Sequence, residues 1–335
     1  GSKFASGFGY GREWVATSPR VAVAPNAGIV TAADEQRSYS KFEFPLNQRY
    51  RTHGTAVLGE LTNPRVDPSA FGGRNSSAEV LIAELPQVTT AYSARGALSA
   101  HVLDGVAWVL LRGTDLSRES AHIAERFVIN VSMGTQAGPH NGSSMLEVAL
   151  DEFIEAYTSP GDGERLAIVL SAGNSFEARC HAQLDFSSSK SAELCLRVLP
   201  DDVTPSYVEI WFPAGADETT TSITLVRPDG AEIAVSVGNV AWMYSRKSTT
   251  VREAMALITK NGAGGDGLMA LLAFAPTENG TAMAGLWKIK VKSEKLFSEP
   301  VHAYVERDNA MFDPARPRGR QSHFVDRSDT TSFSG

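Results

Sequence analysis

The sequence predicts an α/β domain with a parallel sheet and helices on both faces, followed by an all-β domain of the sandwich or jelly-roll type. Before about residue 180, short apolar runs alternate with helical patterns, which is typical of a parallel sheet. After it, short apolar runs follow one another at a spacing of about ten residues with turn residues between them, as in antiparallel sandwiches. The 335 residues leave room for about two domains of roughly 150 residues each.

Three apolar runs are expected to form strands of the α/β domain: Ala78–Leu85, Phe127–Met133 and Leu166–Leu170. Between them, Ser93–Leu111 and Ser143–Tyr157 carry apolar residues every three or four positions, which predicts two helices. The expected order is therefore strand, helix, strand, helix, strand.

The second of these helices has a recognisable start signal. Ser143 and Ser144 precede its apolar pattern, and Glu147 follows Ser144 by three residues. A serine and a glutamate at this spacing can each bond the other's backbone N–H, so the sequence predicts a capping box.

The second half of the chain is expected to contain nine short strands. They are Glu193–Leu199, Ser206–Phe212, Ser222–Val226, Glu232–Val237, Val240–Tyr244, Met255–Thr259, Leu268–Phe274, Leu286–Val291 and His302–Val305. We place the α/β domain at residues 1–178 and the sandwich at 179–308. Residues 309–335 are expected to form an extended tail that leads back towards the α/β domain.

Side-chain chemistry gives two further expectations for the sandwich. The lysines at 288, 290, 292 and 295 largely alternate with apolar residues, which is typical of the solvent-facing side of a strand. Four aromatic residues are expected to pack in the core, the alternative being a platform of an independent binding module for glycan or protein: Tyr207, Trp211, Trp242 and Tyr244.

Composition excludes several classes of protein. Hydrophobic residues make up 42% and charged residues 21%, as in ordinary globular chains. The net charge of −7 argues against nucleic acid as a partner, and no apolar stretch approaches the roughly 18 residues of a membrane span. Two cysteines, Cys180 and Cys195, are too few for a disulfide scaffold or a cysteine-built zinc site. Two reduced thiols are expected, with a bond across a hairpin as the alternative.

The segment Thr52–Leu58, with the sequence THGTAVL, is the first candidate for chemistry. His53 is followed by two small residues and then by apolar ones, which predicts an imidazole in the first turn of a buried helix. Gly54 allows close approach of another backbone.

Two predicted strands end in polar or small residues. Ile168–Leu170 is followed by Ser171, Ala172, Gly173 and Asn174, and the Asn174 carboxamide at a strand end could donate an N–H towards a developing oxyanion. Ile129–Val131 runs on into Ser132, Met133 and Gly134, an open strand edge on which an extended peptide could add.

Taken in their order along the chain, the motifs at His53, at Ser132–Gly134 and at Asn174 resemble those of the subtilisin-like serine peptidases, over roughly residues 50–176. The resemblance implies that His53 is the triad histidine and that Asn174 is the oxyanion-hole residue. It also implies that Ser132, Met133 and Gly134, with Ala172 and Gly173, line the substrate strand.

A narrower resemblance is to bacterial subtilases with a jelly-roll insertion, such as the Csp-type spore-germination proteases. It is carried by residues 137–144 (AGPHNGSS), 304–309 (YVERDN) and 319–322 (GRQS). It implies that the all-β segment is inserted between the oxyanion asparagine and the nucleophile.

The aspartate and serine motifs of the subtilase triad are not found in the sequence. The strand-like run Val21–Ile29 presents Asn26 where a carboxylate is needed, and the only serine candidate is Ser332, in a stretch lacking the family's first glycine and its proline. We therefore expect both groups to come from polypeptide outside this chain, and the chain alone to be inactive.

Two functional hypotheses follow. The first is a serine endopeptidase that cleaves peptide bonds, with peptide or protein as substrate and the remainder of the catalytic domain as a possible partner. The alternative is a pseudoprotease that binds or regulates a partner. No cofactor is expected; structural calcium is common in the family, but no acidic loop here has suitable spacing. The few cysteines and the absence of a leader favour a cytoplasmic bacterial protein, with export as the alternative, although the first residues, Gly1-Ser2, resemble a cloning remnant.

Overall fold

The computed structural model describes residues 54, 56–58, 80–85, 97–120, 126–159, 163–260, 267–277, 280–306 and 320–326. The chain divides into two compact units, one of residues 1–83 with 107–124, the other of residues 84–106 with 125–335. The second unit contains a βαβ segment and a β-sandwich.

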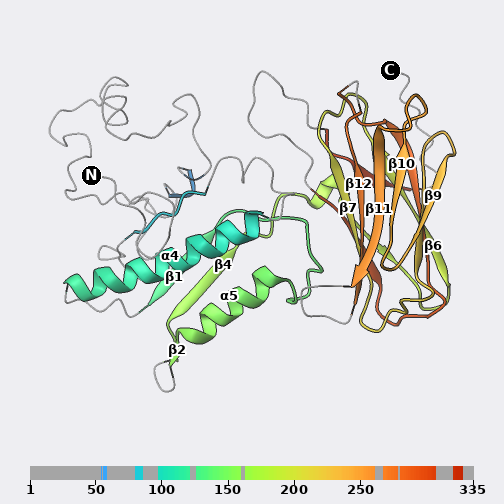
Figure 1. Ribbon diagram of the computed structural model, residues 1–335. Coiled ribbons are helices and arrows are strands. Elements are labelled where there is room, and N and C mark those ends of the chain that lie inside the picture. Colours follow the sequence, from blue (N-terminus) through green and yellow to red (C-terminus); the bar gives the residue numbers. More distant parts are fainter. Residues whose placement is uncertain are drawn as a thin grey trace, which may run out of the picture. The chain divides into compact units, whose positions relative to one another are not determined.

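The βαβ segment consists of β1 (Phe127–Val131), α5 (Met145–Ala156) and β4 (Leu166–Leu170) (Figure 1). β1 and β4 are parallel and in register from Phe127–Leu166 to Val131–Leu170, as the alternating pattern predicts. A two-residue hairpin, β2 (Thr158–Ser159) and β3 (Gly163–Glu164), and the 3₁₀ turn Phe176–Ala178 flank β4.

The expected helices are both present. α4 spans Ala97–Ser120 and buries a stripe at Leu98, Val102, Val106 and Leu110, at helical spacing. α5 begins with the predicted capping box: the Ser144 hydroxyl accepts from the Glu147 N–H at 3.2 Å, and the Glu147 carboxylate accepts from the Ser144 N–H at 3.0 Å.

The strand expected at Ala78–Leu85 is not found. Residues 80–85 form no strand, and Val80 and Ile82 are 48% and 62% exposed. An apolar run becomes a strand only when a neighbour accepts and donates its backbone hydrogen bonds, and no described strand pairs with this one.

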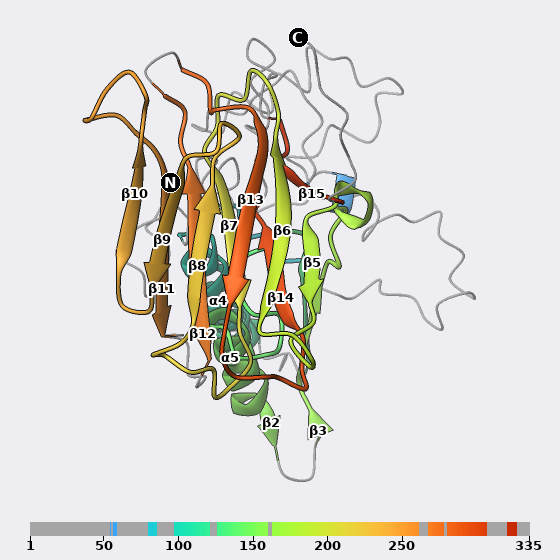
Figure 2. The same ribbon diagram turned by 90° about the vertical axis from the view of Figure 1, so that its right-hand side faces the viewer.

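The sandwich consists of two mainly antiparallel sheets (Figure 2). The six-stranded sheet has the order β10-β11-β12-β7-β14-β5, and the five-stranded sheet β15-β6-β13-β8-β9. The strands are β5 (His181–Leu184), β6 (Ser191–Val198), β7 (Ser206–Trp211), β8 (Ser222–Val226), β9 (Glu232–Ser236), β10 (Val240–Tyr244), β11 (Arg252–Lys260), β12 (Leu268–Phe274), β13 (Gly285–Lys292), β14 (Val301–Val305) and β15 (His323–Val325). Each of the nine apolar runs expected to be strands is one of β6 to β14.

Period-two alternation fills the space between the sheets with apolar side chains. Trp287 of β13 is 1% exposed, and its ring packs edge-on against Phe274 of β12 at a centroid distance of 4.9 Å. The indole N–H donates to the Met283 carbonyl at 3.0 Å, so burial leaves no polar atom of this side chain unsatisfied.

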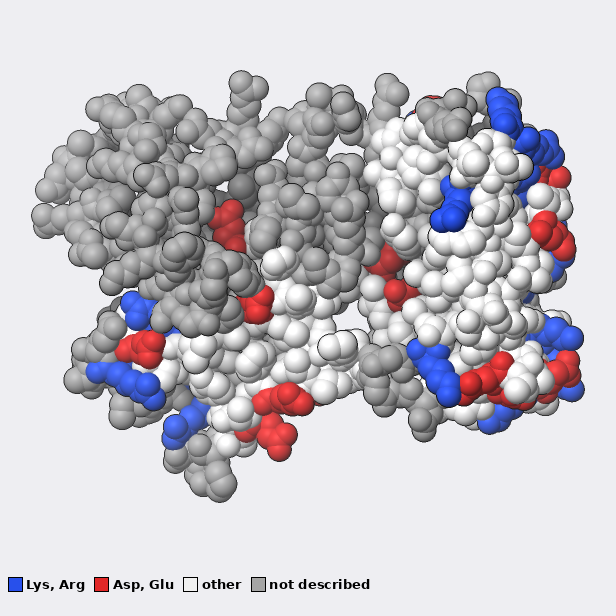
Figure 3. Space-filling view, in the orientation of Figure 1, with Lys and Arg blue, Asp and Glu red and all other residues white. Residues whose placement is uncertain are grey.

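The outer faces of the two sheets differ in chemistry. On β13, Lys288, Lys290 and Lys292 are exposed, as predicted, and Lys290 pairs with Glu232 of β9 at 2.8 Å. The outward positions of β11 and β12 are instead half-buried and apolar: Met255, Leu257, Met269, Leu271 and Ala273. Charged side chains accordingly gather along the right-hand side of the sandwich in Figure 3, and much of its remaining visible surface is uncharged.

The four aromatic residues expected in the core lie outside it. Val208 and Ile210 of β7 point inwards and are fully buried, so alternation turns Tyr207 and Trp211 to the outer face, where both are half-buried. On the edge strand β10, Trp242 and Tyr244 are 37% and 41% exposed.

Two strands of the sandwich were not predicted from the sequence. β5 (HAQL) has no strong apolar pattern. β15 lies within the segment expected to be an extended tail, but it pairs with β6, opposing Phe324 to Leu196. Phe324 is 7% exposed and Ser322 is fully buried, with its hydroxyl 2.9 Å from the Ser206 hydroxyl. Three residues with polar neighbours are too few to show a period-two pattern, so this strand could not be predicted. Its position depends on pairing with β6.

Cys180 and Cys195 are both buried reduced thiols. The expectation of two reduced thiols is confirmed, and the alternative bond across a hairpin is not formed.

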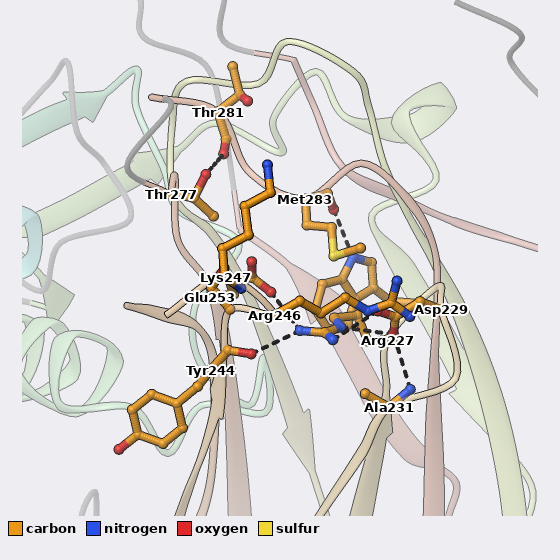
Figure 4. Close-up of polar contacts among 12 residues, drawn as sticks. Arg227, Asp229, Ala231, Tyr244, Arg246, Lys247, Glu253, Thr277, Thr281 and Met283 are labelled. Atoms are coloured by element: carbon orange, nitrogen blue, oxygen red, sulfur yellow. Dashed lines mark hydrogen bonds and ion pairs between the residues drawn. The ribbon is translucent and has the colours of Figure 1, made fainter. Parts of the chain in front are cut away.

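A buried ion-pair network joins the two sheets (Figure 4). Arg227, which follows β8, is 5% exposed and forms two parallel 2.8 Å contacts with Asp229. Its Nη1 also donates to Glu253 of β11 at 2.8 Å and to the Tyr244 carbonyl at 2.9 Å. The hydrogen bond from Arg227 is the main reason why the pKa of Asp229 is lowered to about 2. Arg246 contacts the same carboxylate from the surface.

We predict that Arg227→Met destabilises the sandwich by about 3 kcal/mol, because removing one partner of a buried pair leaves the carboxylate of Glu253 uncompensated. The matched control is Arg246→Met, which removes a 67% exposed partner of the same Asp229 and should cost less than about 1 kcal/mol. Urea denaturation followed by tryptophan fluorescence measures both. Equal losses in the two variants would contradict the assignment of Arg227 as the centre of the network.

Candidate functional site

The carboxyl ends of β1 and β4 form the candidate site. Because Val131 is opposite Leu170, the chain leaves both strands at the same edge, and the Ser171 N–H extends the ladder by donating to the Val131 carbonyl at 3.2 Å. Two segments predicted from the sequence to bind substrate, Ser132–Gly134 and Ala172–Gly173, therefore emerge from neighbouring strands. Asn174, the predicted oxyanion-hole residue, directly follows the second.

The tip of β4 is exposed. Ala172, Gly173 and Asn174 are all exposed, and Gly173 has a φ of +84°, in the region that favours glycine. A Cβ at this position would meet no heavy atom within 4 Å. The turn presents the Asn174 carboxamide to solvent, where its N–H groups can donate.

The segment after β1 is partly buried, and one of its side chains is held by a hydrogen bond. Ser132 and Met133 are half-buried and Gly134 is exposed. The Asn130 carboxamide donates to the Ser132 hydroxyl at 2.8 Å. In the part of the chain that the structure describes, β1 pairs only with β4.

The expected triad positions lie outside the described residues. His53, Asn26 and Ser332 are all in this group. Next to His53, residues 54 and 56–58 are helical, as predicted; Gly54 and Ala56 are exposed, and Val57 and Leu58 are half-buried. The facing of His53 and Asn174 across a common cleft stays a prediction.

Sequence reasoning missed that the loop after Gly134 is bound to the sandwich. The Thr135 hydroxyl donates to Glu306 at 3.1 Å, and the Gly138 N–H donates to Glu209 of β7 at 2.8 Å. Residues 137–144 carry part of the resemblance to the Csp-type proteases, but nothing in their pattern identified the two carboxylates that bind this loop.

A column of stacked rings completes this contact. Tyr304 of β14 stacks on His140 at a centroid distance of 4.1 Å and on His181 of β5 at 4.7 Å. His181 Nε2 lies 3.0 Å from His302 Nδ1. Burial, then the charges of His302 and His140, lower the pKa of His181, and burial raises the pKa of Tyr304.

Neither a metal nor a membrane span is indicated in the described ranges. No group of three or more histidine, cysteine, aspartate or glutamate side chains could hold a metal ion there. No described helix is long and apolar enough to cross a membrane.

Comparison with solved structures shows a likeness in fold. The fold is similar to that of the CspB protease from Clostridium perfringens, with a TM-score of 0.50 and 18% sequence identity. The match covers 69% of this chain and 42% of the CspB chain, so this chain spans less than half the length of that protein. At this identity the likeness concerns the fold, which is rich in β-sheet in both proteins. No protein-family model and no curated sequence matches the chain.

The histidine column predicts a loss of stability in mild acid. Because the folded pKa of His181 lies below the unfolded value of about 6.5, the unfolded chain binds more protons as the pH falls. The stabilising contribution is therefore present above about pH 6.5 and is lost as the pH falls through the folded pKa. Tyr304 stays neutral over this range because its pKa is raised.

Urea denaturation at a series of pH values should show the midpoint falling below about pH 6.5. His181→Gln should flatten the dependence, whereas His323→Gln, outside the column, should leave it unchanged. A wild-type slope preserved in His181→Gln would show that other groups cause the acid sensitivity.

Proposed function

We propose that this chain is part of a subtilisin-like serine endopeptidase. The observation that carries the proposal is the parallel register of β1 and β4, which brings the peptide-pairing segment Ser132–Gly134 and the carboxamide of Asn174 to one sheet edge. Edges of this kind are where ligands bind in α/β sheets. The fold likeness to CspB supports the same proposal.

In the proposed reaction a substrate strand pairs with Ser132–Gly134. A serine hydroxyl attacks the scissile carbonyl carbon while His53 takes its proton, and the carbonyl oxygen becomes an oxyanion that accepts a hydrogen bond from Asn174. The C–N bond then breaks, with the proton passing from His53 to the leaving amine. Water hydrolyses the acyl-enzyme by the same steps.

The proposal assigns the nucleophilic serine and the triad carboxylate to polypeptide outside these 335 residues. Neither Ser332 nor Asn26 fits its role by sequence context. An asparagine at the carboxylate position would favour the wrong imidazole tautomer and reduce turnover by about 10⁴.

A second candidate is a pseudoprotease that binds peptide without cleaving it. The observation in its favour is the absence of the Asp and Ser motifs from the sequence. Both candidates require the peptide edge of β1. They differ in whether a serine becomes nucleophilic.

We predict that a fluorophosphonate probe labels a longer product of the same gene that carries the two missing motifs, and does not label this chain. In that longer protein, Asn174→Ala should lower kcat by about 10²–10³, because one oxyanion donor is lost. Asn239→Ala, an exposed turn residue of the sandwich, is the matched control and should leave kcat unchanged.

Labelling of Ser332 in the 335-residue chain would overturn the assignment of the nucleophile. A longer protein that binds peptide but is neither labelled nor active would favour the pseudoprotease.

A further inference from the structure

We propose that Glu209, Glu306 and Tyr304 of the sandwich are positioning residues for the peptide-binding segment Ser132–Gly134. They hold the loop that directly follows this segment, Thr135–His140, against the outer face of the six-stranded sheet. We call these three residues and their contacts with the loop the clamp. The role of the segment in binding peptide rests on the proposed function, whereas the contacts of the clamp do not.

The first contact lies one residue beyond Gly134. Thr135 Oγ1 donates to Glu306 Oε2 at 3.1 Å and accepts from the Ala137 N–H at 3.0 Å. Glu306 is 2% exposed, and its own carbonyl accepts from the Gln321 carboxamide at 3.1 Å. A buried carboxylate held in this way fixes the start of the loop, because moving the hydroxyl away would remove a charge-assisted hydrogen bond.

The second contact lies at the middle of the loop. The Gly138 N–H donates to Glu209 Oε2 at 2.8 Å, and the Trp211 indole N–H donates to the same oxygen at 2.9 Å. Trp211 lies two residues along β7 on the same face, so it orients the carboxylate. Gly138 has a φ of +105°, which other residues rarely adopt. The loop sequence is thus adapted to present this amide.

The third contact lies at the end of the loop. The His140 ring stacks on Tyr304, which is 6% exposed, and its Nε2 lies 3.1 Å from the Gln136 carbonyl. His140 has a φ of +54°, in the left-handed region that costs a non-glycine residue energy. The stacking and the hydrogen bond hold the residue in this conformation.

The sandwich is the rigid partner in these contacts. Glu209 and Tyr304 lie on β7 and β14, which are interior strands of the six-stranded sheet. The loop contributes a hydroxyl, an amide and a ring from irregular backbone. Functional geometry is held better by groups built on strands than by loops alone, so the sandwich determines the path of the loop and of the segment before it.

The clamp lies beside the apolar part of the outer face of the six-stranded sheet. Strand β13 of the five-stranded sheet carries exposed lysines, whereas the six-stranded sheet has apolar outward positions on β11 and β12, and Glu209 is opposite Leu271 of β12. A displacement of about 1 Å in a substrate-positioning segment can reduce turnover by about 10². The clamp would therefore set how well a peptide strand is presented for cleavage.

The test uses amide order parameters of the full 335-residue chain, measured by NMR in wild type, Glu209→Ala, Glu306→Ala and the control Glu232→Ala. Glu232 is an exposed carboxylate of the five-stranded sheet. We expect the order parameters of the Met133 and Gly134 amides to fall from about 0.85 to below about 0.6 in Glu209→Ala and Glu306→Ala, but not in Glu232→Ala. In Glu209→Gln they should stay close to the wild-type values, because the side-chain carbonyl can still accept the hydrogen bond. Unchanged order parameters of the Met133 and Gly134 amides in Glu209→Ala and Glu306→Ala would overturn the proposal.

A second readout is casein hydrolysis by the longer protein. Glu209→Ala and Glu306→Ala should raise KM for casein about tenfold or more, and Glu209→Gln should have a KM close to that of the wild type. An unchanged KM together with lowered amide order parameters would also overturn the positioning role. If the wild-type longer protein does not cleave casein, the proposed endopeptidase fails. The order parameters then still decide whether the sandwich holds Ser132–Gly134.

Discussion

The parallel register of β1 and β4 is the constraint on which the candidate site depends. Five residue pairs, from Phe127–Leu166 to Val131–Leu170, fix the two strands so that both chains leave at one edge. A shift of one residue would turn every side chain of a strand to its other face. The exposed turn at Gly173 and the open edge after Val131 are useful together only because this register sets them side by side.

The sandwich contributes more than a separate hydrophobic core. Its two sheets enclose a tightly packed interior around Trp287, and the Arg227 network ties one sheet to the other. The outer face of the six-stranded sheet then receives the loop Thr135–His140 through two carboxylates and a tyrosine ring. The stability of the sandwich and the geometry of the peptide-binding segment are in this way linked through a few polar contacts.

The histidine column adds a dependence on pH to the same contact. His140 belongs to the loop, whereas His181 and His302 belong to the six-stranded sheet. Burial lowers the pKa of His181, so the protonated form of this ring is disfavoured in the folded protein.

The sequence by itself determined the local structure: nine strands of the sandwich, the helix at Met145–Ala156 with its capping box, and the segments that follow β1 and β4. These features follow from period-two and 3.6-residue patterns and from cap chemistry, which act over short stretches of chain. Only the tertiary structure decided that Ala78–Leu85 lacks a strand in its described part, that β15 fills a sheet edge, and that Tyr207 and Trp211 face outwards. It alone placed Glu209 and Glu306 against a loop about 70 and 170 residues earlier in the chain, because such contacts depend on how separate elements meet, which leaves no periodic trace in the sequence.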